Sequence, residues 1–197
     1  LTNANLSGVD LSDRDLTGTI LAGANLSGKD LTGTILKGAD LTDAVLPSVS
    51  LSGKDLRKTI FNGVNLSGKD LSKSSLWYAN FENTNLENTD LSFADLMKTD
   101  LSKIKNKSLV GTDLSFASFF LSDLPGINLS DVTLKTTNFR GADLSGVDFT
   151  VTTNTPYQGT IFREADLSNS NFEGINLSPV QVFDGHTEND VQLKQAF

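Results

Sequence analysis

Apolar residues recur at every fifth position over the first half of the chain. From Leu1 to Leu101, each of these positions holds Leu or Phe. The preceding residue is usually Asp or Asn and the one before it is usually small, as in Ala24-Asn25-Leu26. This period fits neither the turn of a helix, about 3.6 residues, nor the alternation of a strand. It indicates a solenoid, in which the stacking of short units supplies the core.

The same triplet returns along the chain, for example as Ala4-Asn5-Leu6, Ala39-Asp40-Leu41 and Ala94-Asp95-Leu96. These residues resemble the pentapeptide-repeat family, whose motif is A(D/N)LXX, over about nine-tenths of the chain. The resemblance implies an all-β fold, a right-handed quadrilateral parallel β-helix with four pentapeptides to a coil and about nine coils. The central Leu or Phe and the residue two before it would point inward.

Four cations depart from the family pattern, because they stand two residues before a centre, where the family has a small inward residue. These are Arg14, Lys29, Lys54 and Lys69. A fully buried, unpaired cation costs several kcal/mol. We therefore expect their stems to lie along the core while the charged heads reach outward.

Two steps of eight residues interrupt the register, from Leu101 to Leu109 and from Phe149 to Tyr157. Both are explained by bulges of three extra residues, at 102–108 and 150–156, that leave the coils in stack. This alignment places the phenylalanines in columns: Phe119, Phe139 and Phe162 in one, Phe149 and Phe172 in another, and Phe61 and Phe81 in a third.

The repeat fades after Leu177, so we divide the chain into a β-helix at 1–177 and a C-terminal cap at 178–197. Asn189 or Asp190 could begin a short helix in this cap. Solenoid ends expose apolar residues and backbone edges, which a cap would cover. Dimerisation through the tail is the alternative.

Composition narrows the possible functions. The net charge of −8 argues against direct nucleic-acid binding but leaves open an acidic surface that imitates a nucleic acid. The chain has no Cys and only one His, His186, so we expect no metal site and no cofactor. No stretch approaches the ~18 apolar residues of a membrane span, and no targeting segment is visible, which favours a cytoplasmic location.

Outward positions differ between the four faces of the predicted coil. Two faces carry columns of Asp, such as Asp10, Asp30 and Asp70 on one and Asp100, Asp123 and Asp143 on the other. These carboxylates could imitate phosphate rows or hold a cation. They could instead hydrogen-bond the backbone of local turns and keep the surface soluble. We expect this second role.

A further face differs in carrying aromatic, apolar and basic side chains. It is predicted to hold a partner-binding surface made of Arg57, Trp77, Tyr78, Phe93, Met97, Phe116, Phe120 and Leu121. Aromatic residues, Met and Arg are enriched at interfaces. The alternative is that these residues merely stack on one another at the surface.

Catalysis finds no support in the sequence, because no nucleophile has a positioned base. We expect a rigid, non-enzymatic scaffold that docks a protein partner or a second copy, as a homodimer, through the aromatic and basic face. The alternative follows from the resemblance, since some pentapeptide-repeat proteins imitate DNA and protect DNA gyrase or topoisomerase from inhibitors. A continuous acidic stripe along an assembled dimer would favour that alternative.

Overall fold

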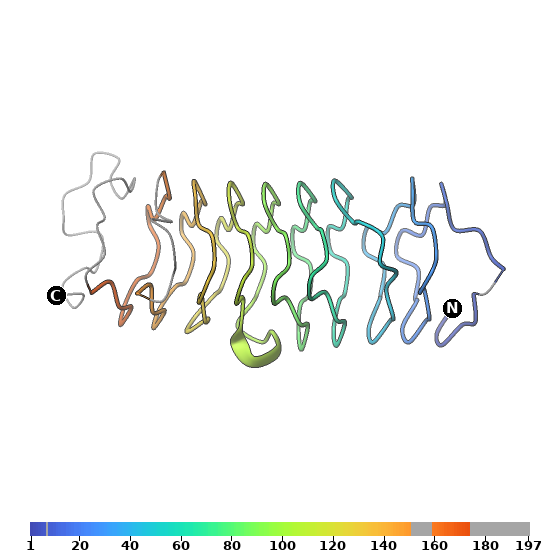
Figure 1. Ribbon diagram of the computed structural model, residues 1–197, viewed down its shortest axis with the longest axis horizontal. Helices are drawn as coiled ribbons and strands as arrows, with labels where there is room; N and C mark the ends of the chain where they lie inside the picture. Colours follow the sequence, from blue (N-terminus) through green and yellow to red (C-terminus); the bar gives the residue numbers. More distant parts are fainter. Residues whose placement is uncertain (7, 151–158, 174–197) are drawn as a thin grey trace.

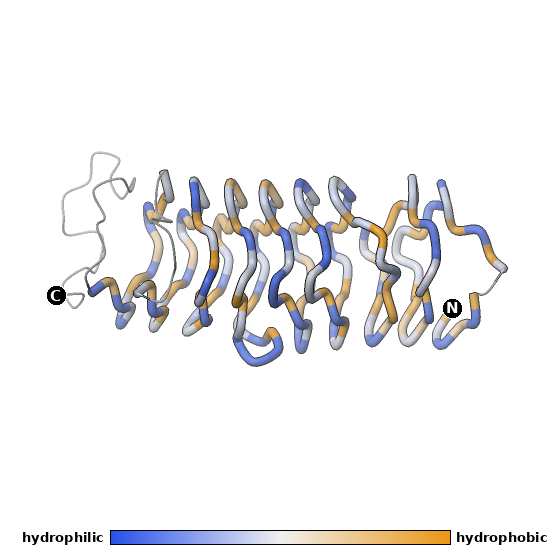
Figure 2. Tube along the Cα trace, viewed as in Figure 1, coloured by the Kyte–Doolittle hydropathy of each residue, from blue (hydrophilic) through white to orange (hydrophobic). Residues whose placement is uncertain are grey.

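The computed structural model describes residues 1–6, 8–150 and 159–173. The described chain is an elongated stack of coils, with the N-terminus at one end and the later residues at the other (Figure 1). Apolar and polar stretches alternate along each coil (Figure 2). The five-residue repeat therefore winds the chain into a solenoid.

Parallel β-bridges join successive coils in four columns, so each coil has four faces. We number the faces by one bridge each: face 1 contains Asn65↔Asn85, face 2 Asp70↔Asp90, face 3 Ser75↔Asp95 and face 4 Asn80↔Asp100. Among the described residues, the bridges are isolated pairs and the one helical element is the 3-10 helix η1, Lys105–Lys107. The predicted parallel β-helix with four-sided coils is confirmed.

Tight turns form the corners between the faces. The carbonyl of nearly every centre accepts the N–H of the residue three positions later, as when Ala24 N donates to Leu21 O at 2.9 Å. The third residue of the turn has a positive φ, +65° at Gly23, which glycine adopts at little cost. Asp13 has the same backbone at φ +56° without being glycine. The turn geometry is thus common to the repeat, whatever residue occupies it.

The repeat centres form the core, and Leu21, Leu41 and Phe61 are fully buried. The predicted columns of phenylalanines are confirmed, and two of them run across the second break in register. The ring centroids lie 5.2 Å apart for Phe119 and Phe139, 5.6 Å for Phe139 and Phe162, 4.3 Å for Phe149 and Phe172, and 5.5 Å for Phe61 and Phe81. Stacked pairs of this kind stabilise by about 0.5–1.5 kcal/mol beyond the area they bury.

Buried hydroxyls at the second inward position tie each coil to the one before it. Thr59 Oγ1 donates to Leu36 O at 2.9 Å, and Thr34 Oγ1 donates to Leu11 O at 2.8 Å. In both cases the acceptor is the carbonyl of a repeat centre. A polar residue is therefore accommodated in the core because this carbonyl has a second lone pair to offer.

The inward lysines also donate to backbone carbonyls of the preceding coil, and for Lys54 that carbonyl belongs to a repeat centre. Lys54 Nζ donates to Leu31 O at 2.6 Å, Lys29 Nζ to Val9 O at 3.0 Å and Lys69 Nζ to Pro47 O at 2.7 Å. Their stems follow the wall, as expected, but the heads stop at the backbone of the preceding coil rather than extending freely into water. Arg14 lies in an exposed position.

The first bulge contains η1, which is the loop that projects from the side of the stack in Figure 1. Ile104, just before η1, is buried in the core, and Ser108, just after it, bridges to Asn128. Lys105 to Lys107 are thus the three extra residues, and the coil resumes beyond them. Bridges such as Asp90↔Asp113 confirm that the bulge leaves the coils in stack.

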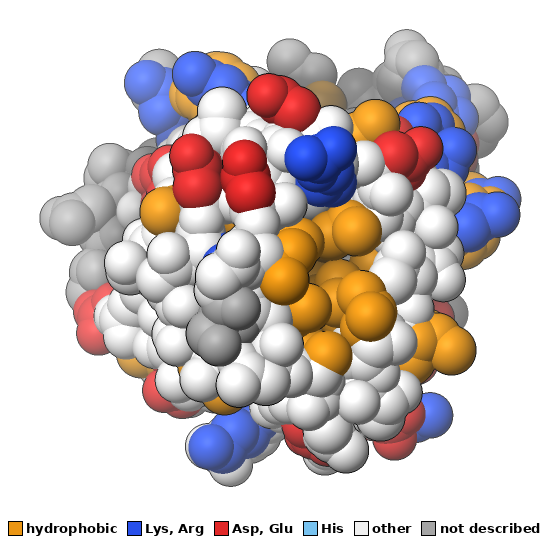
Figure 3. All heavy atoms as spheres, turned by 90° about the vertical axis from the view of Figure 1, so that its right-hand side faces the viewer, with side chains coloured by type: hydrophobic (Ala, Val, Ile, Leu, Met, Phe, Trp, Pro, Cys, Tyr) orange, Lys and Arg blue, Asp and Glu red, His pale blue; other side chains and the backbone are white. Residues whose placement is uncertain are grey.

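The second bulge, at 150–156, lies almost entirely outside the described residues, as does the cap at 178–197. The bridges Asn138↔Ile161 and Asp148↔Asn171 nevertheless show that the coils on either side of the second break stay aligned. At the other end of the stack, apolar side chains gather in the middle of the end surface (Figure 3). Leu1 and Val9 are exposed there, by 57% and 45%.

Candidate interaction surface

The predicted partner-binding residues lie in two rows, one along each edge of face 3. We call the two rows together the aromatic strip. The first row follows face 3 and contains Arg57, Trp77, Tyr78, Met97, Phe120 and Leu121. Backbone bonds from Tyr78 N to Met97 O at 3.3 Å and from Lys98 N to Phe120 O at 3.0 Å show that this row is one column, as predicted.

The second row precedes face 3 and consists of Phe93 and Phe116. Their ring centroids are 4.5 Å apart and their planes differ by 6°, so the rings stack face to face across two coils. Between the two rows runs the polar column of face 3, which includes Ser75 and Asp95. The strip therefore has two apolar rows that flank a polar column rather than one unbroken apolar patch.

The bulky residues of the strip are exposed at turn positions that glycine fills in other coils. Tyr78, Phe93, Phe116 and Leu121 are 49%, 53%, 41% and 44% exposed. All four have φ between 55° and 60°, where a non-glycine residue costs about 1–2 kcal/mol. Exposing these four side chains at such positions therefore costs backbone conformational energy.

Cations from the following coil lie over three of the rings. Lys98 Nζ is 5.7 Å from the centroid of Tyr78, Lys135 Nζ is 5.9 Å from that of Phe116, and Arg140 Cζ is 5.8 Å from that of Phe120. At exposed sites such contacts contribute about 0.5–1 kcal/mol. The basic border of the strip is thus in contact with its aromatic rows.

Arg57, at one end of the first row, is held in a single orientation. Its Nε and Nη2 donate to the two carboxylate oxygens of Asp55, at 2.8 and 2.6 Å. These hydrogen bonds lower the pKa of the Asp55 carboxyl and raise the pKa of the Arg57 guanidinium. Because both side chains are partly exposed, the pair fixes geometry more than it stabilises the fold.

Trp77 stands in the middle of the first row and has an unsatisfied polar atom. Its Nε1 is shielded from solvent and has no hydrogen-bond acceptor among the described residues. A buried donor without an acceptor costs about 1–3 kcal/mol.

The Asp columns behave as expected for turn-bonding residues. Most of their carboxylates accept the N–H of the residue two positions later, as from Ser102 N to Asp100 at 2.8 Å and Ser145 N to Asp143 at 2.9 Å. Asp123 is the exception in its column, because residue 125 is Pro and has no N–H. Partial burial, with Asp100 and Asp143 as like-charged neighbours, raises the pKa of Asp123.

Two other kinds of feature, a metal-binding cluster and a membrane-spanning helix, are absent from the described part of the chain. No three His, Cys, Asp or Glu side chains within it are placed to hold a metal ion. No helix in the same part is long and apolar enough to cross a bilayer.

Comparison with known families decides the relationship that the coil geometry suggests. The model for pentapeptide repeats matches in eight copies, over residues 1–38, 30–63, 39–76, 65–102, 108–150 and 158–178. This chain belongs to the pentapeptide-repeat family. The gaps between the matched segments, at 103–107 and 151–157, coincide with the two bulges of this family member.

Solved structures of other pentapeptide-repeat proteins are similar. QnrB1, a plasmid-mediated fluoroquinolone resistance protein, is 21% identical over 81% of this chain and 83% of its own, with a TM-score of 0.42. HetL, from the cyanobacterium Nostoc and involved in heterocyst differentiation regulation, is 25% identical over 82% of each chain, with a TM-score of 0.28. A family member from the Arabidopsis thaliana thylakoid lumen is 26% identical over 64% of this chain and 70% of its own, with a TM-score of 0.27. TM-scores this low support no inference beyond the family. A comparison with curated proteins returned no match.

Three features of the surface were missed from the sequence. These are the Asp55 partner of Arg57, the left-handed backbone under the exposed apolar residues, and the backbone bond from Lys105 N to Thr84 O, which sets the bulge beside Asn85. The last depends on how the bulge folds, since the stacked alignment continues face 1 from Asn85 to Ser108, which bridges to Asn128. The first two depend on side-chain and turn geometry that spacing does not report.

Proposed function

We propose that this chain is a rigid, non-catalytic scaffold that docks a protein partner or a second copy through the aromatic strip. The observation that carries the proposal is the set of bulky apolar side chains held exposed at left-handed turn positions, Tyr78, Phe93, Phe116 and Leu121. The left-handed backbone recurs throughout the repeat, so these four residues stand out because they are large, apolar and exposed where many other coils have Gly, Asn, Asp or Lys. The unsatisfied Nε1 of Trp77 adds a donor that a partner could satisfy. The proposal also includes three features of the fold: a right-handed sense, a count of about nine coils, and a C-terminal cap at 178–197.

The size of the aromatic strip limits the area that a partner can bury on it. The strands of neighbouring coils are about 4.8 Å apart, so a row of four coils is roughly 15 Å long. A standard interface buries ~800 Å² on each partner, which is more than one such row offers. The polar column between the rows, with Ser75 and Asp95, would therefore take part in the contact.

The test is the Trp77→Ala, Phe120→Ala double variant. Removal of central aromatics should weaken association by about 2 kcal/mol or more each while leaving folding nearly unchanged. Self-association is measured by analytical ultracentrifugation and partner capture by pull-down from the source cell. The matched control is Ile20→Ala with Val45→Ala, since both side chains are exposed and lie outside the strip. If the double variant behaves as the parent in both assays, the strip is only a surface ladder.

A second candidate, imitation of DNA toward DNA gyrase, is favoured by one observation. Asp100, Asp123, Asp143 and Asp166 occupy successive coils of face 4 in one bridged column. The column is not acidic over its whole length, because Ile60 and Asn80 precede Asp100. Inhibition of DNA supercoiling by purified gyrase, lost on Asp143→Asn with Asp166→Asn, would favour this candidate over the first.

A further inference from the structure

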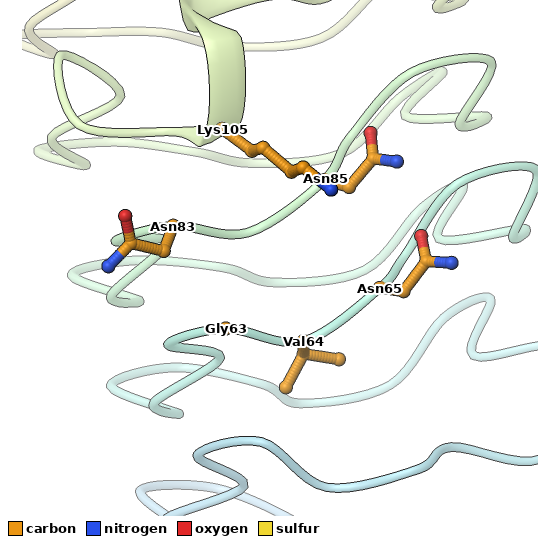
Figure 4. A pocket seen from close by; sticks show the side chains of 6 residues that line it. All are labelled: Gly63, Val64, Asn65, Asn83, Asn85 and Lys105. Atoms are coloured by element: carbon orange, nitrogen blue, oxygen red, sulfur yellow. The ribbon is translucent and has the colours of Figure 1, made fainter.

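A depression of about 350 Å³ lies beside the first bulge, away from the aromatic strip. Its lining residues come from two coils and from the bulge: Gly63, Val64, Asn65, Asn83, Asn85 and Lys105. Figure 4 shows the Asn65 and Asn85 amides side by side in the same orientation, with the Lys105 side chain extending from the bulge toward Asn85. Asn83 points away from them (Figure 4).

The two asparagines present donors because their oxygens are already occupied. Asn65 Oδ1 accepts the N–H of Ser67 at 3.1 Å, and Asn85 Oδ1 accepts the N–H of Glu87 at 3.1 Å. Each amide is thereby fixed with its Nδ2 turned outward. Neither Nδ2 group donates a hydrogen bond to any described residue.

Lys105 adds a positive charge to the same column. Its backbone N donates to Thr84 O at 2.9 Å, just as Asn85 N donates to Val64 O at 3.1 Å. Lys105, although it is one of the three extra residues, is therefore bonded to the coil before it in the way that Asn85 is. Its ammonium has no partner among the described residues, so an unpaired cation stands beside two amide donors.

The chemistry of the lining matches an anion. None of the six lining residues carries a carboxylate, in a chain whose net charge is −8. The carboxylate of Asp43 lies against Gly63 from the preceding coil, which leaves the end near Lys105 as the positive end of the depression. Hydrogen bonds from donors to an ionised oxygen are about twice as strong as those between neutral groups.

We propose that Asn65, Asn85 and Lys105 form a binding site for an oxyanion, a carboxylate or a phosphate group. The site is independent of the aromatic strip and of the partner proposed for it. The bulge creates it, because it places Lys105 beside a stretch of face 1, at Asn65 and Asn85, that carries no charge. A single anionic group held by these donors would bind weakly, with a dissociation constant of about 1 mM.

The test is a titration of the full chain, labelled with ¹⁵N, followed by NMR through the side-chain amide signals of Asn65 and Asn85. Inorganic phosphate and acetate are the two probes, and sodium chloride at equal ionic strength is the control. Saturable shifts of both amides with phosphate or acetate, and not with chloride, are expected. The probe that saturates at the lower concentration tells whether a phosphate or a carboxylate is the better ligand.

Asn85→Asp is the sharpest variant, because it replaces the outward donor by an acceptor and keeps the oxygen that caps the turn. Asp occurs naturally in this column at Asp148, so the fold accepts it. Binding should be lost in this variant and weakened about tenfold in Lys105→Gln. The controls are Asn25→Asp, in the same column but remote from the depression, and Lys107→Gln, in the same bulge. Equal losses in Asn25→Asp and Asn85→Asp, or unchanged binding in Lys105→Gln, would overturn the assignment.

Discussion

Lys54 offers a test of how this solenoid tolerates a cation at an inward position. Its ammonium donates to Leu31 O at 2.6 Å, the same type of carbonyl that Thr59 reaches with its hydroxyl in the next repeat. Burial is the main cause that lowers the pKa of Lys54, and the nearby Asp30 carboxylate opposes it. Relative to its neutral form, the charged form of Lys54 is therefore less stable in the folded state than in water.

The expected cost of Lys54→Ala is about 1 kcal/mol. A hydrogen bond from a charged donor contributes about 1.5–3 kcal/mol to stability. Removing the lysine also removes the cost of burying its charge, which offsets part of the lost hydrogen-bond energy. Leu31 O also keeps its bond from Thr34 N at 3.1 Å, so no carbonyl is left without a partner. Lys54→Thr restores a donor without a charge and should be as stable as the parent, within about 0.5 kcal/mol.

Stability is measured by urea unfolding, followed by far-UV circular dichroism and by the fluorescence of Trp77, with the two transitions required to coincide. Since the folded-state pKa of Lys54 is lowered, the penalty on its charge exists at neutral pH and disappears as the pH rises through that pKa toward the unfolded value. The parent should therefore gain stability relative to Lys54→Thr in this alkaline range. If Lys54→Thr costs as much as Lys54→Ala, or either costs more than about 2 kcal/mol, the hydrogen-bond account of the inward lysines is wrong.

Three further predictions concern the surface and the bulge. Asp123→Asn should stabilise the fold at neutral pH, with a gain that vanishes as the pH falls below the range in which a carboxyl ionises, because the pKa of Asp123 is raised in the folded state. Asp30→Asn should bring no such gain, since hydrogen bonds from Thr32 lower the pKa of Asp30; urea unfolding at several pH values separates the two. Tyr78→Gly should leave thermal stability unchanged or higher, because glycine adopts the positive φ of this position at little cost. Gly38→Ala should lower stability by about 1 kcal/mol, because alanine adopts a positive φ only at a cost; the opposite order would contradict the positive φ of the two positions. Deletion of Lys105–Lys107 should leave a folded chain with a melting temperature within a few degrees of the parent, and loss of cooperative melting would show that η1 is part of the core.

The sequence by itself determined the solenoid. An apolar residue at every fifth position can be buried only if the chain turns at every repeat, so the spacing alone predicted the stacked coils and the inward positions. It also predicted that the first bulge keeps the stack, because that alignment sets Phe93 beside Phe116 across the break, and their rings do stack. Column membership follows from counting, since each coil repeats the one before.

The tertiary structure decided what the outward side chains do. Spacing placed Phe93 beside Phe116, but only the structure showed that the rings are parallel, that a polar column separates them from the row of Trp77, and that their backbone is left-handed. The structure likewise placed Lys105 beside Asn85 across the bulge. These properties depend on rotamers and on contacts between coils, where several arrangements share one spacing and packing selects among them.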